Sequence, residues 1–182
     1  MLAQTEIVHF PYTVSHRDVK HPRLEFRTGT LLVVLPNGQD ENRVLEKHRK
    51  WIECKYQFIH DAIDTSATIT LESRTKEELR TRVQELIAIY SQELGCAPDR
   101  LFIKKMCTKW ASCSKKGNMT INSLGQYLPW DLIEYIVYHE MVHLINPNHD
   151  SLFWRYINKK FKNTAEIEKN LCTYWFQVQR ME

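Results

Sequence analysis

The sequence contains no long hydrophobic run, no large excess of one charge and no paired-cysteine motif. Its 182 residues carry a formal net charge of +3, which gives no strong electrostatic reason to expect a nucleic-acid partner. The N-terminus has no apolar core of signal-peptide length, and no stretch is long enough to span a bilayer. The five cysteines are odd in number and form no CxxC pair, as is typical of reduced thiols. We therefore predict a cytoplasmic protein with no membrane partner.

The most informative segment is His139-Glu140-Met141-Val142-His143, followed by His149. On an α-helix, residues four positions apart share a face, so both imidazoles of the HExxH pattern can reach one metal ion. Glu140 is close enough to reach a water on that ion without being a ligand. Two histidines and a carboxylate base are what a zinc hydrolase requires. The pattern predicts one catalytic Zn²⁺ ion, with Glu140 as the general base.

The residues around this pattern predict that it lies on a helix. Pro129 suits a first helical turn, and Asp131 complements the positive end of the helix dipole. Pro147 disfavours helical angles at Asn146, so the helix should end there. A stripe of apolar residues indicates packing against a core; its members are Leu132, Ile133, Ile136, Val137, Met141 and Leu144.

The spacing of His149 makes it the preferred third metal ligand. Five residues separate it from His143, the gap found in the metzincin pattern, although Asn146 stands where that pattern has a glycine. The competing ligand is Glu166, which would come from a later helix as in zincins with a His₂Glu site. Asp150 is predicted to be the N-cap of the next helix or a partner of a histidine.

The order of elements predicts an α+β fold in two parts. Residues 1–74 form a β-rich region with one helix: strands are expected at 7–14, 24–27 and 30–35, and a helix at 41–62. Residues 75–182 form the catalytic part, which opens with the capping box Thr75-x-x-Glu78. Strands over 101–106 and 119–122 precede the HExxH helix, and two further helices follow from about 151 and 164.

Several blocks resemble the YgjP-like metallopeptidase family, which is akin to the SprT and WLM zinc proteases. They are Thr108–Ser114, Asn118–Asn122, the HExxH segment, Asn148-His149 and Phe153-Trp154. The resemblance implies a zincin-like catalytic domain, with helices packed on a small antiparallel sheet, and a peptide or protein substrate. It also implies His139, His143 and His149 as zinc ligands and Glu140 as the catalytic carboxylate. Ala111 departs from the family's usual glycine, which puts the backbone shape of that loop in question.

Substrate-binding residues are expected on the segment before the HExxH helix. We expect 119–122 to be the cleft edge to which an extended peptide adds, with Trp110, Ser112 and Asn122 near the cleft. The alternative is that Trp110 belongs to the core and that Ser112 and Asn122 only satisfy turns. Cys113 is interpreted as a buried thiol, with a role as fourth ligand as the alternative. Three tyrosines could assist catalysis: Tyr127, Tyr138 and Tyr156.

Two other functions use the same residues. Five lysines near the expected cleft could face the phosphates of a nucleotide, whose phosphoanhydride the metal site would hydrolyse; they are Lys104, Lys105, Lys109, Lys115 and Lys116. The same lysines could contact nucleic acid in a module whose metal is structural. An open coordination position argues against a purely structural metal, because structural zinc is normally held by four protein ligands.

Overall fold

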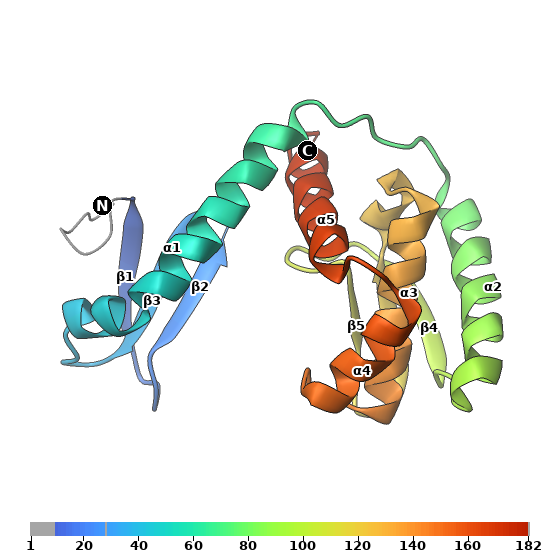
Figure 1. Ribbon diagram of the computed structural model, residues 1–182, viewed down its shortest axis with the longest axis horizontal. Helices are drawn as coiled ribbons and strands as arrows, with labels where there is room; N and C mark the ends of the chain where they lie inside the picture. Colours follow the sequence, from blue (N-terminus) through green and yellow to red (C-terminus); the bar gives the residue numbers. More distant parts are fainter. Residues whose placement is uncertain (1–9, 28, 182) are drawn as a thin grey trace. The chain divides into compact units, whose positions relative to one another are not determined.

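The computed structural model describes residues 10–27 and 29–181 (Figure 1). The chain divides into two compact units with the boundary between Ala67 and Thr68. Each unit has its own hydrophobic cluster. No helix in the described ranges is long and apolar enough to cross a membrane.

The N-terminal unit is a three-stranded sheet with one long helix. Its elements are β1 (Tyr12–Arg17), β2 (Arg23–Arg27), β3 (Thr30–Pro36) and α1 (Glu41–Ser66). The order is β1-β3-β2, with β1 parallel and β2 antiparallel to β3. The first strand begins later than expected, and residues 7–9 of that expectation lie outside the described ranges. Alternate residues of β3 are fully buried beside α1, and the cluster includes Leu31, Val33, Leu35, Leu45 and Ile52.

The C-terminal unit carries the candidate site. Its elements are α2 (Lys76–Leu94), β4 (Arg100–Lys104), β5 (Ala111–Cys113), β6 (Asn118–Asn122), the 3₁₀ helix η1 (Ser123–Tyr127), α3 (Trp130–Ile145), α4 (Ser151–Lys160) and α5 (Thr164–Gln179). The predicted α+β class is confirmed. In Figure 1, α3 lies between α2 and α5.

The strand order in this unit corrects one expectation. The order is β4-β6-β5, so β6 is the central strand and its two edges are already paired. It therefore cannot be the cleft edge that accepts an extended peptide, as the sequence had suggested. The sheet is also mixed, because β4 runs parallel to β6 while β5 runs antiparallel. The edge strand nearest to α3 is β5, which pairs Ala111 with Ile121 and Cys113 with Met119.

Helix α3 is buried over most of its surface, which explains its hydrophobic composition. It begins directly after Pro129 and ends at Asn146, as predicted. Tyr90 of α2 donates a hydrogen bond to Glu134, which joins the two helices. Nine residues of α3 are buried, from Leu132 to Val142, and all of them except Glu140 belong to the larger core cluster. A helix so enclosed holds its side chains in fixed positions.

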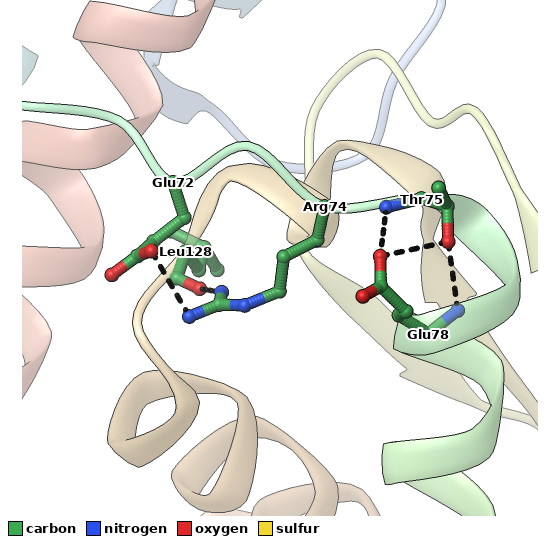
Figure 2. A network of polar contacts seen from close by, with 5 residues as sticks. All are labelled: Glu72, Arg74, Thr75, Glu78 and Leu128. Carbon is green, nitrogen blue, oxygen red and sulfur yellow. Dashed lines mark hydrogen bonds and ion pairs between the residues drawn. The ribbon is translucent and has the colours of Figure 1, made fainter.

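An extended segment ties the start of α2 to the start of α3 (Figure 2). The Arg74 guanidinium donates to the Leu128 carbonyl and pairs with Glu72 at 3.2 Å. It also lies 3.9 Å from the centre of the Trp130 ring. The Glu72 N–H donates to the Tyr127 carbonyl at 3.1 Å. We call residues 68–75 the strap; it holds the two residues directly before Pro129.

Candidate metal centre

The three predicted histidines come together in space. His139 and His143 lie one turn apart on α3, and His149 comes from the loop between α3 and α4. One ring nitrogen from each lies within 4.8 Å of the others, and the Nε2 atoms of His139 and His149 are 3.0 Å apart. Imidazole nitrogens around one tetrahedral zinc lie about 3.3 Å apart, given Zn–N bonds of about 2.0–2.1 Å. The arrangement therefore fits a single ion.

A hydrogen bond sets which nitrogen of His143 is available to a metal. Its Nδ1 lies 3.2 Å from the Asn146 carbonyl oxygen. Because a carbonyl only accepts, Nδ1 must carry the proton, and Nε2 is left with its lone pair. Burial together with the two neighbouring imidazoles lowers the pKa of His139 to about 3. Burial also lowers the pKa of His143, so both histidines are favoured in the neutral form that binds metal.

The loop that carries His149 is organised by Asn146 and Asp150. Asn146 has an extended backbone with φ −134° and ψ 105°, so the chain turns without the left-handed residue of the metzincin pattern. Its side chain accepts from the Asn148 N–H at 3.2 Å and donates to Asp150 at 2.6 Å. The same Asp150 oxygen caps α4 by accepting from the N–H groups of Leu152 and Phe153. The short loop is thus tied at both ends.

Phe153 forms an apolar support beneath all three histidines. Its side chain is fully buried, and its ring centre lies 4.8 Å from His139, 4.7 Å from His143 and 4.6 Å from His149. Such packing restricts the ring orientations of the ligands. The sequence pattern predicts no separate role for Phe153. Its position four residues after His149, in the first turn of a helix, was the available signal.

Glu140 lies beside the histidines with one oxygen unpaired. The residue is only 7% exposed, and its Oε2 atom has no hydrogen-bond partner within the described part of the chain. Burial raises its pKa to about 7, while the Lys109 ammonium and the Cys113 backbone N–H act in the opposite direction. A buried carboxylate oxygen without a partner is costly unless a ligand satisfies it. Together with the three imidazoles, it forms a donor set that fits a divalent cation and its water.

A cleft of about 480 Å³ opens over these residues, and β5 forms one wall. Ser112 lines it together with Ala111, Cys113 and the two lysines 109 and 115. Ala111 occupies a regular strand position, so its difference from the family's glycine requires no unusual backbone.

Trp110 and Asn122 do not line this cleft, which corrects the expectation for Asn122. Its side chain is fully buried and donates to the carbonyls of Met106 and Lys109, at 2.9 and 2.8 Å. It fixes the loop before β5 and is not among the residues that line the cleft. The Trp110 indole N–H donates to the Leu171 carbonyl at 3.1 Å, and its ring packs edge-to-face on Trp175. Trp110 instead lines a smaller neighbouring cavity.

The alternatives for further ligands and catalytic groups lie outside the histidine group. Glu166 is exposed on α5 and is not part of the histidine group. Cys113 lines the cleft, but burial and Glu140 raise the pKa of its thiol to about 11, which favours the protonated form. The cleft lining contains none of the three candidate tyrosines and, of the five lysines, only those at 109 and 115.

Comparison with known proteins connects this geometry to a family. Residues 64–174 match the family model described as YgjP-like, metallopeptidase domain. Similar solved structures include the metallopeptidase zymogen of Pyrococcus abyssi abylysin, 29% identical over 50% of this chain and 92% of that chain, with a TM-score of 0.46. Another is the metallopeptidase zymogen of Methanocaldococcus jannaschii jannalysin, 24% identical over 57% of this chain and 97% of that chain, with a TM-score of 0.42. No curated protein matches the chain.

The family match covers more than half of the sequence, and it includes every residue of the histidine cluster and Glu140. It confirms the resemblance found in the sequence motifs. A divalent metal and a hydrolytic reaction follow from that membership. The chain belongs to the YgjP-like metallopeptidase family.

Proposed function

We propose that the protein is a zinc-dependent peptidase in which His139, His143 and His149 hold one zinc ion and Glu140 is the general base. The observation that carries the proposal is the buried, unpaired Oε2 of Glu140 beside three clustered imidazoles. Three nitrogen ligands leave one coordination position open, which is the arrangement of catalytic zinc. Imidazole nitrogens also favour zinc over magnesium or calcium.

Bound zinc would supply Lewis acidity that lowers the pKa of water and polarises the scissile carbonyl. Glu140 accepts a proton from the attacking water as the new C–O bond forms. It then delivers that proton to the amine nitrogen as the C–N bond breaks. The Lys109 ammonium and the Cys113 N–H favour the ionised carboxylate that the first step needs. Phe153 and the surrounding buried side chains exclude bulk water from one side of the site.

The edge position of β5 supports a peptide substrate. Among the described strands β5 pairs only with β6, and its residues line the cleft. An extended peptide can add to such an edge by main-chain hydrogen bonds, which places its carbonyl groups at regular spacing beside the metal site. Ser112, in the middle of β5, is the residue we assign to this contact.

Metal analysis and cleavage of an unfolded protein substrate test the proposal. Wild type should bind one zinc, and His149→Ala should lose it. Glu166→Ala, an exposed acidic residue, is the matched control and should retain it. Glu140→Gln should keep zinc and lose nearly all turnover. Ordinary activity in Glu140→Gln would remove this residue from the mechanism, and full zinc in His149→Ala would overturn the ligand set.

One observation supports a second function, hydrolysis of a nucleotide phosphoanhydride. Lys109 and Lys115 line the cleft and could contact phosphates. Both activities need Glu140 and the metal, so variants at these positions cannot distinguish them. Assaying a nucleoside triphosphate and the protein substrate in parallel can. Binding to DNA that depends on salt and survives Glu140→Gln would instead indicate a nucleic-acid module.

A further inference from the structure

A second cavity adjoins the metal cleft on the side of α5. It measures about 150 Å³ and is lined by Trp110, Ala111, Tyr135, Ile136, His139, Glu140, Glu168 and Leu171. Three of these, Ala111, His139 and Glu140, also line the main cleft. A substrate whose reacting bond lies at the metal could therefore place a neighbouring group in this cavity. Whole-ligand pockets are typically about 300–1,000 Å³, so the cavity suits one side chain.

The α5 side of this cavity carries a single carboxylate, Glu168. Glu168 and Leu171 lie three residues apart on α5 and therefore on one face of the helix. Tyr135 donates its hydroxyl hydrogen to Glu168 Oε1 at 2.5 Å. Burial, followed by the contact with Glu168, raises the pKa of Tyr135, so its hydroxyl stays a donor across the physiological range. The bond fixes the carboxylate through one of its two oxygens.

Besides His139 and Glu140, which face the metal cleft, the remaining walls are apolar and held in place. Trp110 is anchored to α5 by its bond to the Leu171 carbonyl and by its contact with Trp175. Ala111 and Ile136 are buried, and Leu171 belongs to the core cluster. A fixed carboxylate beside these apolar side chains is complementary to a side chain with an apolar stem and a cationic end. Arginine and lysine have this construction.

We propose that this cavity binds a lysine or arginine side chain of the substrate next to the scissile bond, and that Glu168 determines this specificity. The inference rests on the proposed peptidase function. Lys109 and Lys115 line the main cleft but not this cavity. They would therefore repel a basic residue placed in the main cleft. The two regions therefore impose opposite charge preferences along the bound peptide.

The first experiment measures kcat/KM of the zinc-loaded enzyme on N-acetylated peptides that differ only in the residue flanking the cleaved bond. Wild type should prefer arginine or lysine over leucine. Glu168→Gln keeps an acceptor for Tyr135 and should reduce that preference about ten- to hundredfold, the effect of losing a charged hydrogen bond. Glu166→Gln makes the same change at an exposed position on α5 and should leave the preference unchanged. A wild type without the preference, or a Glu168→Gln variant that keeps it, overturns the proposal.

A binding experiment separates this proposal from the peptidase function itself. N-acetyl-argininamide should shift the Trp110 indole N–H resonance, assigned with Trp110→Phe, whereas N-acetyl-leucinamide should not. Glu168→Gln should abolish the shift and Glu166→Gln should retain it. If no peptide is cleaved but the shift follows this pattern, the peptidase function fails and the cation site stands. A different result would assign Glu168 to the α-ammonium group of the substrate. If cleavage requires a free amino terminus, and Glu168→Gln loses only that requirement, the assignment to a side chain is wrong.

Discussion

Replacing Asn146 with alanine should weaken zinc binding although Asn146 is not a ligand. The buried amide makes two hydrogen bonds, to Asp150 and to the Asn148 N–H, which together hold the loop that presents His149. Each bond stabilises the loop by about 1 kcal/mol, and partners of metal ligands typically change affinity by about 10–100-fold. A loss of about 2 kcal/mol corresponds to roughly a thirtyfold weaker zinc affinity. Because Asn146 has φ −134°, alanine introduces no backbone strain.

The assay is competition for zinc with a chromophoric chelator at fixed pH. Asn148→Ala is the matched control, because it removes a side-chain amide of the same kind from an exposed position. Only the backbone N–H of Asn148 bonds to Asn146, and alanine keeps it. Circular dichroism should show that both variants retain the fold. The reasoning is refuted if Asn146→Ala binds zinc as tightly as wild type, or if Asn148→Ala weakens binding by the same factor.

Three further predictions concern stability. Phe153→Ala should lower the free energy of unfolding by about 3–5 kcal/mol and release zinc, because it empties the space beneath the ligands. A loss of stability in calorimetry no larger than that of an exposed substitution would contradict this. Hydrogen bonds from the Thr75 backbone N–H and hydroxyl lower the pKa of Glu78. The stability that this contact contributes is therefore present above the unfolded-state pKa of Glu78 and is lost as pH falls through its folded-state pKa. Urea midpoints measured down to about pH 3 should show this loss, and Glu78→Gln should flatten it. Met119→Ala in the central strand should lower the free energy of unfolding by about 2–5 kcal/mol. Phe102→Ala on β4, where the side chain is 43% exposed, should lower it much less. Equal urea midpoints for the two variants would refute the burial argument.

The parts of the fold that depend on residues close together in the sequence could be predicted from the sequence. The capping box at Thr75 and the left-handed Gly95, with φ 69°, bound α2 where expected. Pro129 and Asn146 likewise mark the ends of α3. The HExxH pattern could be interpreted because helical periodicity alone brings its two histidines to one face. In each case the determining interactions lie within about one helical turn.

The features that were missed depend on contacts between distant segments. The central position of β6 comes from its parallel pairing with β4 and its antiparallel pairing with β5, which leaves no periodic signal in either strand. The three residues of β5 are too few for alternation to be detected. Asn122 is polar and precedes the metal helix, so it resembled a cleft residue, yet its partners are carbonyls 13 and 16 positions away. The pairing of Glu168 with Tyr135 spans 33 positions and could not be inferred from either residue alone.

The strap has a consequence for where the catalytic part can be separated from the rest of the chain. A fragment beginning at residue 75, the boundary suggested by the sequence, would lack Glu72 and Arg74. The carbonyls of Tyr127 and Leu128, just before the helix that bears His139 and His143, would then lose their partners. A fragment beginning at Thr68 keeps those bonds and matches the observed unit. The shortest autonomous enzyme should therefore include the strap, and cleavage within residues 72–74 should inactivate the protein without touching any ligand.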